Sequence, residues 1–413
     1  MKIKINKNIS SDFFSSLIIA FLMTGIFTLS GTTDALYMLL IYIVAALYIV
    51  NACIKTRFKC LNYFTTPVAG WYLLFSSMMF FYGFFGEHTE EYSLIFHFSN
   101  IVYVLFIGII MYYKRTRVLY VFTTACRLTI IFETVYLIIN DLEILLSKIG
   151  DIIAGNSHYR FGETGAGNVN LTAMAYVFML IPILYEIRSK RNLKLNYILL
   201  IIGLLVILLT GSKKGIIGFV IILICLEVSL NKTNALKWLK GIGIMCVLIL
   251  IVRIVPLFYN MIWTRMETMI QTLISFNITD EASTSMRMKF ITTALQTFWD
   301  KPLFGHGWYS FAYESGFGYY THCNFTELLF NLGLIGLVLY YLFPIFIVTK
   351  CKKTSKQNKV MAIIYLSVLI FFDTSAVTFY SSNLCAYIGF SFLYMLVKYS
   401  SSIENIGIYE RIR

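Results

Sequence analysis

Charged residues are scarce in this chain. Asp, Glu, Lys and Arg make up 13% of its 413 residues, whereas 58% of the residues are hydrophobic. Soluble domains carry about 25% charged residues, so the composition excludes an ordinary soluble protein and indicates a polytopic membrane protein. Proline is also rare, with five residues, and no internal repeat is visible. Both absences argue against the paired broken helices of many secondary transporters.

Metal-binding patterns are missing as well. The eight cysteines form no Cys-X-X-Cys pair, and the five histidines have no carboxylate or second ligand at a metal-binding spacing. The sequence also lacks an Asp-X-Asp cluster of the kind that holds a metal-bound sugar nucleotide, which argues against a cytosolic nucleotide-sugar glycosyltransferase. We therefore predict neither a metal nor a cofactor. Cys323, beside His322, is a candidate thiol nucleophile, although one unpaired thiol is weak support.

Long apolar runs make up most of the sequence. A spanning helix needs roughly 20 mostly apolar residues, and its backbone must be satisfied inside lipid, which favours helices over strands. We predict an all-α protein, a single membrane domain over residues 1–413, with about twelve transmembrane helices. The predicted spans are 12–32, 34–53, 62–85, 94–113, 118–140, 171–187, 195–211, 215–230, 241–258, 326–348, 360–378 and 382–397.

The basic residues indicate the orientation of these spans. If the N-terminal MKIKINK is cytoplasmic, the Lys and Arg clusters of alternate loops all fall on that side, as the positive-inside rule requires. Both termini are then predicted to be cytoplasmic, with outer loops at 142–170 and 259–325. The net charge of +13 fits anchoring at an anionic inner leaflet far better than nucleic-acid binding.

The segment 259–325, between predicted spans nine and ten, is the longest polar interruption. A loop of this length between spans is usually functional or disordered. Apolar residues at helical spacing predict one amphipathic helix over 259–273 and a second over 285–300. Pro302 ends the second, because proline disfavours helix at the residue before it. The glycine- and aromatic-rich stretch that follows favours a folded, functional extracytoplasmic loop.

Two lysines violate the charge rule. Lys213 and Lys214 lie at the short outer turn between spans seven and eight. They are either a tolerated positive charge or an anion site. For the second interpretation, Gly211 and Gly215 allow close backbone approach, and the amides that open span eight add donors. Such a site fits a phosphate group at the outer leaflet.

Several arginines and one histidine are further candidates. A guanidinium binds phosphate oxygens bidentately and stays charged, and Arg160, Arg253 and Arg287 lie at or near predicted outer segments. Each is alternatively a loop, structural or solvated residue. Arg127, inside span five, has Glu133 or residues of other helices as equally possible partners. Histidine titrates near neutral pH, so His322, at the mouth of span ten, suits acid/base work, with a structural role as the alternative.

Four segments, taken in order, resemble the family of O-antigen and capsule polymerases and O-antigen ligases. RFGETGAGNVNLTA is similar to its R-x-x-G...N segment, and TGSKKGIIGF to its TGSRG helix opening. RMKFITTALQTFWDKPLFGHG resembles its PLxGxG block, and THCNFTELLFNLGLIGLVLYY its H-N-x-x-L...G-L-I-G segment. Two positions depart from the pattern. Lys213 replaces an arginine, and Cys323 follows His322, so that Asn324 is displaced by one.

The resemblance implies a metal-independent, GT-C-like membrane glycosyltransferase at the outer face of the bacterial cytoplasmic membrane. It implies that Arg160 and Arg287 grip the diphosphate of a polyprenyl-linked glycan and that His322 assists the acceptor. We predict Trp308, Tyr313 and Tyr320 as stacking surfaces for sugar rings. The predicted catalytic residues are then His322 and Arg287, and the predicted diphosphate-binding residues are Arg160, Lys213, Lys214 and Arg253.

The predicted function is polymerisation of undecaprenyl-diphosphate-linked repeat units into O-antigen or capsular polysaccharide. Its partners would be a lipid-linked glycan donor and acceptor, a chain-length regulator and a flippase, without nucleic acid. A ligase on the same fold differs in its acceptor, and no residue discriminates between the two. Cell-wall elongation polymerases are disfavoured because no acidic residue is framed convincingly in an outer loop. A transporter or flippase for lipid-linked sugars is the alternative of a different class.

Overall fold

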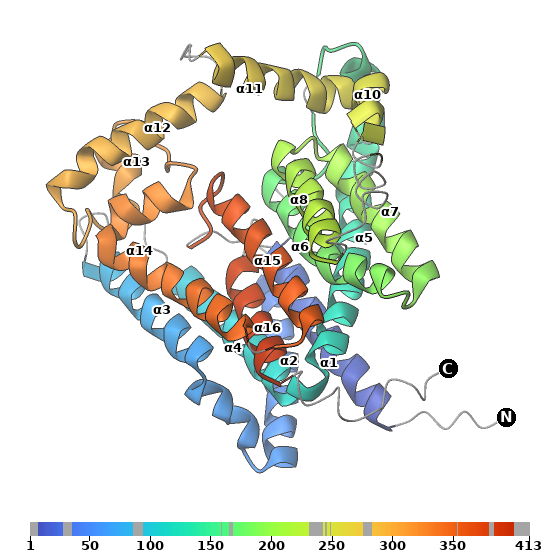
Figure 1. The fold of residues 1–413 in the computed structure, drawn as a ribbon, viewed down its shortest axis with the longest axis vertical. Helices are drawn as coiled ribbons and strands as arrows, with labels where there is room; N and C mark the ends of the chain where they lie inside the picture. Colours follow the sequence, from blue (N-terminus) through green and yellow to red (C-terminus); the bar gives the residue numbers. More distant parts are fainter. Residues whose placement is uncertain are drawn as a thin grey trace.

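All regular elements described in this computed structural model are helices. The structure describes residues 7–27, 35–85, 94–157, 159–164, 168–230, 243, 246–247, 249–275, 283–352, 354–379 and 384–399. Within these ranges no strand occurs (Figure 1). The all-α class predicted from the long apolar runs is therefore confirmed for the described part of the chain.

The long helices overlap the predicted spans. They are α1 (Lys7–Phe27), α2 (Ala35–Thr56), α3 (Pro67–Phe85), α4 (Leu94–Tyr113), α5 (Val118–Ile153), α6 (Val169–Arg188), α7 (Leu193–Leu209), α8 (Lys213–Leu230), α14 (Asn324–Cys351), α15 (Lys356–Asp373) and α16 (Cys385–Tyr399). Among the described residues, four stretches are long and apolar enough to cross a membrane, namely Leu39–Thr56, Pro67–Phe85, Val169–Arg188 and Asn324–Cys351. Part of the ninth predicted span, 241–258, lies outside the described residues. The full set of twelve spans stays a prediction.

Helix α5 continues well past the end of its predicted span at residue 140. It has 36 residues, which corresponds to about 54 Å of helix, whereas the hydrocarbon core of a bilayer is about 30 Å thick. Its last turns occupy the first part of the predicted outer loop 142–170. That loop therefore begins as helix, and its described irregular residues are 154–157, 159–164 and 168.

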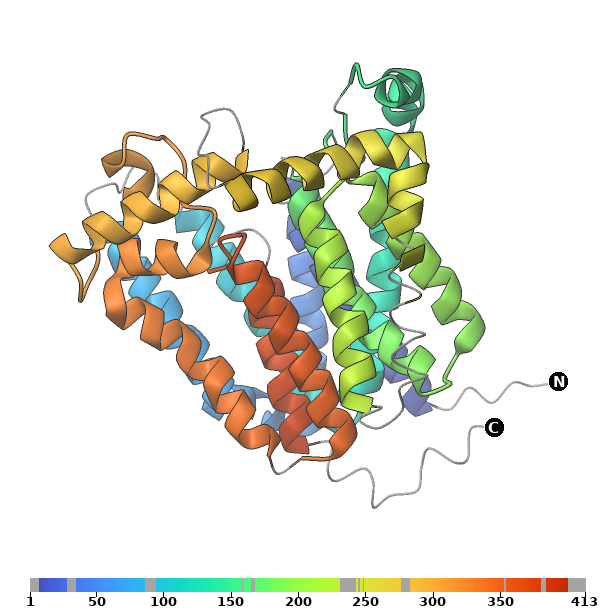
Figure 2. The same ribbon diagram turned by 45° about the horizontal axis from the view of Figure 1, so that its top comes forward.

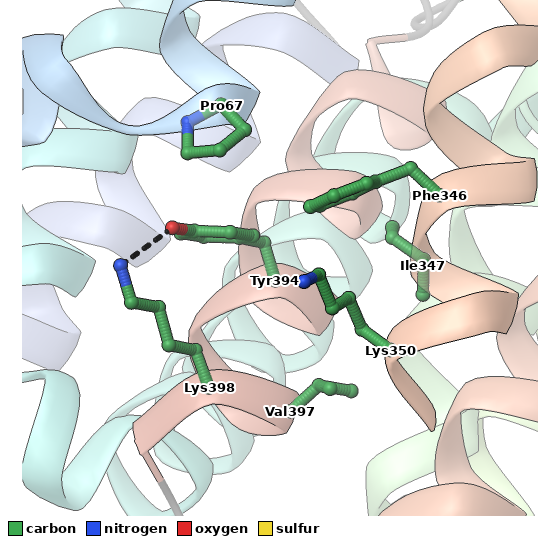
Figure 3. A pocket seen from close by; sticks show the side chains of 7 residues that line it. All are labelled: Pro67, Phe346, Ile347, Lys350, Tyr394, Val397 and Lys398. Atoms are coloured by element: carbon green, nitrogen blue, oxygen red, sulfur yellow. Dashed lines mark hydrogen bonds between the residues drawn. The ribbon is translucent and has the colours of Figure 1, made fainter. Parts of the chain in front are cut away.

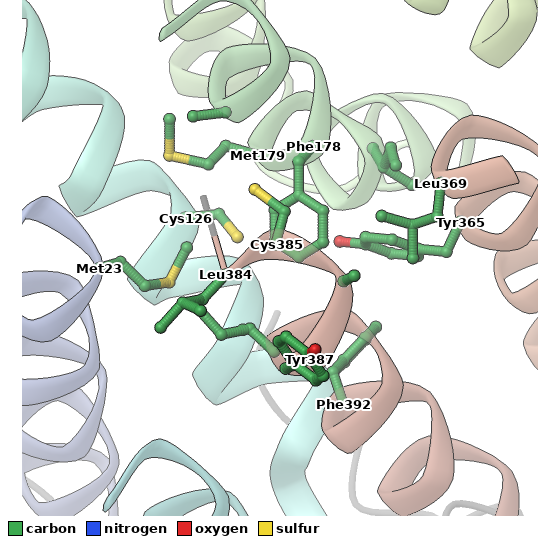
Figure 4. Close-up of a cluster of buried hydrophobic side chains, with 14 of the residues drawn as sticks. Met23, Cys126, Phe178, Met179, Tyr365, Leu369, Leu384, Cys385, Tyr387 and Phe392 are labelled. Atoms are coloured by element: carbon green, nitrogen blue, oxygen red, sulfur yellow. The ribbon is translucent and has the colours of Figure 1, made fainter. Parts of the chain in front are cut away.

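Helices α1, α5, α6, α15 and α16 meet in one hydrophobic core (Figure 4). Phe122 of α5 stacks on Phe392 of α16, with ring centroids 4.2 Å apart. The side chains labelled in Figure 4 are all buried, namely Met23, Cys126, Phe178, Met179, Tyr365, Leu369, Leu384, Cys385, Tyr387 and Phe392. This packing brings the C-terminal helices against the N-terminal half of the chain.

Arg127 takes its partners from neighbouring helices. Its guanidinium forms an ion pair with Glu186 of α6, and its Nε donates to Oδ1 of Asn196 at the start of α7, at 2.9 Å. Of the two possibilities that the sequence left open, the inter-helix one is therefore correct, and Glu133 is not the partner. A buried charge inside a helix bundle requires such pairing, so Arg127 ties α5 to α6 and α7.

Basic residues of the predicted cytoplasmic loops meet at one end of the bundle. Asp12, near the start of α1, forms ion pairs with Lys114, at 2.9 Å, and with Arg117 in the turn between α4 and α5. The guanidinium of Arg115 lies 5.4 Å from the ring centre of Tyr399 at the end of α16. These contacts agree with the predicted alternation of the spans, while the side of the membrane to which this end belongs stays a prediction.

Two helices of the long segment 259–325 run across the opposite end (Figure 2). They are α11 (Thr264–Ser275), which follows the π-helical turn η5 (Tyr259–Trp263), and α12 (Ser283–Thr297), which ends in the 3₁₀ turn η6 (Phe298–Asp300). The short helix α13 (Ser310–Glu314) lies in the glycine-rich stretch that follows. These helices lie where the apolar periodicity places them, and η6 ends two residues before Pro302.

The loop after η6 is fixed to a kink in α14. Gly333 has φ 66° and ψ −167°, which is not helical. The backbone groups freed by the kink bond to the loop, since the N–H of Leu334 donates to the carbonyl of Pro302 and the N–H of Gly307 donates to the carbonyl of Asn331, both at 2.9 Å. The PLFGHG and NLGLIG segments thus fold together as one unit that leads into the bundle.

We expect Gly333→Ala to destabilise the protein strongly. A Cβ at this position would lie 2.3 Å from the carbonyl oxygen of Leu303, in a backbone conformation that is essentially restricted to glycine. The expected loss is about 3 kcal/mol or more, read as a fall in Tm of the purified protein. Gly316→Ala is the matched control, because φ is also positive there but no atom lies within 4 Å of the added Cβ. Equal losses in the two variants would contradict the close packing at Gly333.

Candidate functional site

The structure gathers five of the predicted site residues from separate parts of the chain. Arg160 precedes α6, Lys213 and Lys214 open α8, Arg287 lies on α12 and His322 precedes α14. The charges of Arg287 and Lys214 act on the imidazole of His322, and those of Arg287 and Arg160 act on the ammonium group of Lys213. We call these five residues, with Arg265, the cationic cluster.

Arg160 is held in place by the turn between α7 and α8. Its Nε donates to the carbonyl of Thr210 at 2.6 Å, and its Nη2 donates to Oδ1 of Asn170 at 3.1 Å. The hydroxyl of Ser212 donates to the same Asn170 oxygen at 3.0 Å. Asn168 caps α6, accepting from the backbone N–H of Asn170 at 3.1 Å. The RFGETGAGN and TGSKK segments are therefore parts of one structure.

The glycines of the TGSKKG turn serve packing. Gly211 has φ 58°, and a Cβ there would lie 3.1 Å from the carbonyl oxygen of Met261 and 3.5 Å from Nε of Arg160. A Cβ on Gly215 would lie 2.8 Å from Cβ of Ala173 on α6. The close approach expected from these glycines is thus made by neighbouring protein segments. An anion at this turn would therefore interact with the side chains of Arg160 and the two lysines more than with exposed backbone.

The two lysines connect α8 to other parts of the site. The Nζ of Lys213 donates to the carbonyl of Arg265 on α11 at 3.2 Å, and the Nζ of Lys214 donates to the carbonyl of Ser375, just after α15. Arg265 belongs to the cluster, because its charge acts on Arg160, Lys213 and Arg287. Arg265 is not among the residues predicted for the site, because its position in the long loop is the one feature of the sequence that indicates a role in the site.

His322 has an unusual backbone and an enclosed ring. Its φ is 59°, a left-handed conformation that is uncommon for a residue with a side chain and is found at functional sites. The ring centroid lies 4.2 Å from that of Tyr320 and 6.1 Å from that of Phe290. Burial, followed by the charges of Arg287 and Lys214, lowers the pKa of His322 to about 3. The imidazole is therefore neutral at pH 7, with a free lone pair, and it is a weak base in the free protein.

Positive charge is concentrated in the cluster. In the described part of the chain, none of the five lysines and arginines of the cluster takes part in an ion pair. Burial, with a contribution from the charge of Arg265, lowers the pKa of Arg160 to about 10, and burial also lowers the pKa of Arg287. Arg160 therefore stays charged at pH 7, and a guanidinium is in general not deprotonated in proteins. A ligand with two or more negative charges would offset the repulsion between the positive charges of the cluster, which suits a diphosphate.

The start of α14 is locked to the segment after α15. Oδ1 of Asn324 accepts from the backbone N–H groups of Thr378 and Phe379, at 2.8 and 3.1 Å. Its Nδ2 donates to the hydroxyl of Tyr341 at 3.2 Å, and that hydroxyl donates to Asp373 at 2.7 Å. Asn324, the displaced asparagine of the THCNF motif, thus fixes the start of α14, which His322 precedes by two residues. The members of this network are far apart along the chain, so the sequence pattern alone does not reveal it.

The remaining predicted residues are distributed differently. Tyr320 lies in the cluster, where burial raises the pKa of its phenol and the charge of Arg287 opposes that shift. Trp308 packs against the main hydrophobic core, and Tyr313, on α13, is 41% exposed. Arg253 is exposed, with its guanidinium 5.4 Å from the ring centre of Trp263. The structure does not bring Arg253 to the cluster, since its charge is not among those that act on the cluster residues.

Sequence comparison relates part of the chain to a known family. No curated protein matches the chain. Residues 198–341 match the family model described as O-antigen ligase. The matched region contains every residue of the cationic cluster except Arg160, and it covers the loop that is fixed to the kink of α14. It supports a membrane enzyme of ligase or polymerase type that acts on lipid-linked glycans. The match thus confirms, over residues 198–341, the predicted resemblance of the chain to the O-antigen ligase and polymerase family.

Proposed function

We propose that this protein is a membrane glycosyltransferase that polymerises undecaprenyl-diphosphate-linked oligosaccharide units at the outer face of the bacterial cytoplasmic membrane. The observation that carries the proposal is the cationic cluster. In it, the charges of Arg287 and Lys214 act on the neutral imidazole of His322, and the other three basic residues interact with one another and with Arg287. A diphosphate would bind to the arginines and lysines, while His322 would face the reacting hydroxyl. The position of most of the cluster within the region of the family match supports the same assignment.

In the proposed reaction, a hydroxyl oxygen of the acceptor unit attacks the anomeric carbon of the donor glycan. The bond from that carbon to the diphosphate oxygen breaks, and the polyprenyl diphosphate leaves with the electron pair. Arg160, Arg287 and Lys213 stabilise the negative charge that grows on the leaving group. In the transition state the hydroxyl proton is transferred in part to His322, which also positions the acceptor, and the proton is on the imidazole once the new glycosidic bond has formed.

Substrate binding is expected to activate His322. Burial, followed by the positive charges of Arg287 and Lys214, lowers its pKa in the free protein, and a bound diphosphate would offset the effect of those charges. The pKa of the imidazole would then rise from about 3 towards neutral pH, where a general base is most effective. Proton acceptance is thereby coupled to the presence of the donor. Tyr320, whose ring is 4.2 Å from that of His322, is placed to stack on a sugar of either substrate.

A gel profile of surface polysaccharide tests the proposed function. A deletion strain would be complemented with the wild-type protein or with a variant of the site, His322→Asn or Arg287→Ala, at equal protein level. For a polymerase, the variant should lose long chains and accumulate single lipid-linked repeat units. A flippase that supplies those units and a chain-length regulator are the expected partners. A normal ladder in every site variant would contradict the catalytic assignment and favour transport.

A ligase is the second candidate, because the matching family model is described as O-antigen ligase, and the match does not distinguish a ligase from a polymerase. A ligase would use the same diphosphate leaving group and the same imidazole, but it would transfer a finished polymer to a different acceptor. The same gel separates the two functions. Intact polymer that stays on its lipid carrier in the inactive variant would identify a ligase.

The pH dependence of turnover tests the electrostatics of the cluster. Because the pKa of His322 is about 3 in the free protein, the imidazole stays neutral throughout the range from pH 8 to 5. Protonation of His322 should therefore cause no loss of kcat/KM in that range, since kcat/KM reports the free enzyme. Lys214→Gln removes one of the charges that lower the pKa, so the acid limb of its residual activity should move to higher pH. A wild-type acid limb near pH 6.5 that is lost in His322 variants would contradict this account.

A further inference from the structure

A cavity lies at the opposite end of α14 from the cationic cluster. It has a volume of about 370 Å³ and is lined by Lys350, Lys398, Tyr394 and four apolar residues, of which Phe346 is the largest (Figure 3). The lining comes from the first residue of α3 and from the last turns of α14 and α16. Nothing in the proposed transfer reaction uses this place.

The cavity is about one membrane thickness away from the cluster. The part of α14 after its kink at Gly333, residues 334–351, corresponds to about 27 Å along the helix axis, and the hydrocarbon core of a bilayer is about 30 Å thick. His322 precedes the first residue of this helix, whereas Lys350 is next to its last residue. If the cluster faces the lipid head groups of one leaflet, the cavity therefore lies at the head-group level of the other leaflet.

The two lysines are held by aromatic side chains. The Nζ of Lys398 donates to the hydroxyl of Tyr394 at 2.9 Å and lies 5.2 Å from the ring centre of Tyr399. The Nζ of Lys350 lies 5.2 Å from the ring centre of Phe346. Among the residues that the structure describes, neither amine forms an ion pair. Figure 3 shows the two side chains on either side of Tyr394, so the cavity presents two positive charges that a negative group can bind.

The surface beside the cavity is apolar. On the same turns of α14 that line the cavity, Leu342, Ile345 and Val348 are 55%, 61% and 52% exposed. A soluble anion would use the amines and leave this surface unused. A phospholipid would use both, because its phosphate would meet the lysines while its acyl chains lie along α14. Basic pockets between spanning helices at the head-group level are typical binding sites for anionic lipids.

We propose that this cavity binds the phosphate of an anionic phospholipid through Lys350 and Lys398. The hydroxyl of Tyr394 adds a polar contact, and Phe346 with the exposed face of α14 covers the upper part of the acyl chains. The site is independent of the proposed glycosyl transfer, and it would anchor the ends of α14 and α16 to one leaflet.

Lipid binding to the purified full-length protein tests this proposal. The Tm and native mass spectra would be recorded with phosphatidylglycerol, phosphatidylcholine, inorganic phosphate or glycerol phosphate. We expect phosphatidylglycerol to raise the Tm of the wild type. The Lys350→Ala/Lys398→Ala variant should bind it roughly 30-fold more weakly, because each lysine near a lipid surface contributes about fivefold. Lys194→Ala/Lys356→Ala, which removes two exposed lysines outside the cavity, should bind like the wild type.

Each outcome decides the proposal. Equal effects of phosphatidylcholine and phosphatidylglycerol, or equal weakening in the two double variants, would overturn it. An equal effect of inorganic phosphate or glycerol phosphate would show that the cavity takes a soluble anion and would overturn the lipid assignment. If the cavity double variant does not fold, lipid binding is measured with the single variants Lys350→Gln and Lys398→Gln instead. Each single variant should lose about fivefold, and unchanged binding in both would refute the site.

Discussion

Replacing His322 with asparagine is expected to reduce glycan transfer by roughly 10²–10⁴-fold, the usual contribution of a positioned general base. Asparagine tolerates the left-handed backbone that His322 adopts, with φ 59°, and it keeps a polar side chain. It cannot accept a proton, however, so the loss should appear in turnover at an unchanged protein level. The measurement is the transfer rate from a synthetic lipid-linked repeat unit, with the surface polysaccharide gel as the readout in cells.

The neighbouring thiol provides the control. Cys323 is buried beside His322, and its backbone N–H and carbonyl both bond to the hydroxyl of Thr321. Cys323→Ser preserves the size of the side chain but removes the thiol. Activity close to that of the wild type is expected, because the proposed reaction uses no thiol. Full activity in His322→Asn together with loss in Cys323→Ser would reverse the assignment and favour Cys323 as nucleophile.

Replacing Arg287 with alanine is expected to reduce transfer by roughly 10²–10³-fold, as happens when one preorganised electrostatic donor is removed. Its guanidinium is half-buried on α12, and its charge reaches both Lys213 and His322. Arg287→Lys should lose less than Arg287→Ala, because the charge remains while the bidentate fork is lost. The rate with a saturating lipid-linked donor separates this effect from weaker donor binding.

Lys289 is the matched control for Arg287, since it lies two residues further along α12 and its charge is not among those that act on the cluster. Lys289→Ala removes one positive charge from the same helix and should change the rate little. Similar losses in Lys289→Ala and Arg287→Ala would mean that the overall charge of the loop matters and that the cluster has no specific role. The alanine variant at Arg287 should also raise the pKa of His322, which a pH profile of its residual activity would show.

The apolar runs and the basic loops determined much of this architecture by themselves. A run such as 171–187 has no stable alternative to helix in lipid, because every backbone group must be bonded within the segment, and α6 occupies that place. The proline after Lys301 likewise fixed where the loop helices end. The order of the motifs was also sufficient to indicate the family that the match over residues 198–341 supports.

Several assignments needed the tertiary structure. Arg265 and Arg253 look alike in the sequence, as single arginines near the outer end of the ninth predicted span. The packing of α11 against the start of α8 places Arg265 in the cluster, whereas Arg253 lies on the exposed side against Trp263. Trp308 and Tyr320, both predicted as stacking surfaces for sugars, are partly buried and pack against the core, so their role in sugar binding stays a prediction. Which face of a short helix points inwards depends on neighbours that periodicity alone does not identify.

The sequence by itself determined the class of the protein, its helical segments and the kinds of residue that the site would contain. These properties depend on local chemistry, namely hydropathy, backbone bonding and the charge of single side chains. The tertiary structure decided which of those residues share one site, what lowers the pKa of His322, and how Asn324 and Gly333 position the start of α14. It also revealed the lysine cavity at the far end of α14. Such features arise from contacts between segments that are distant in the chain, and the pattern of any one segment does not contain them.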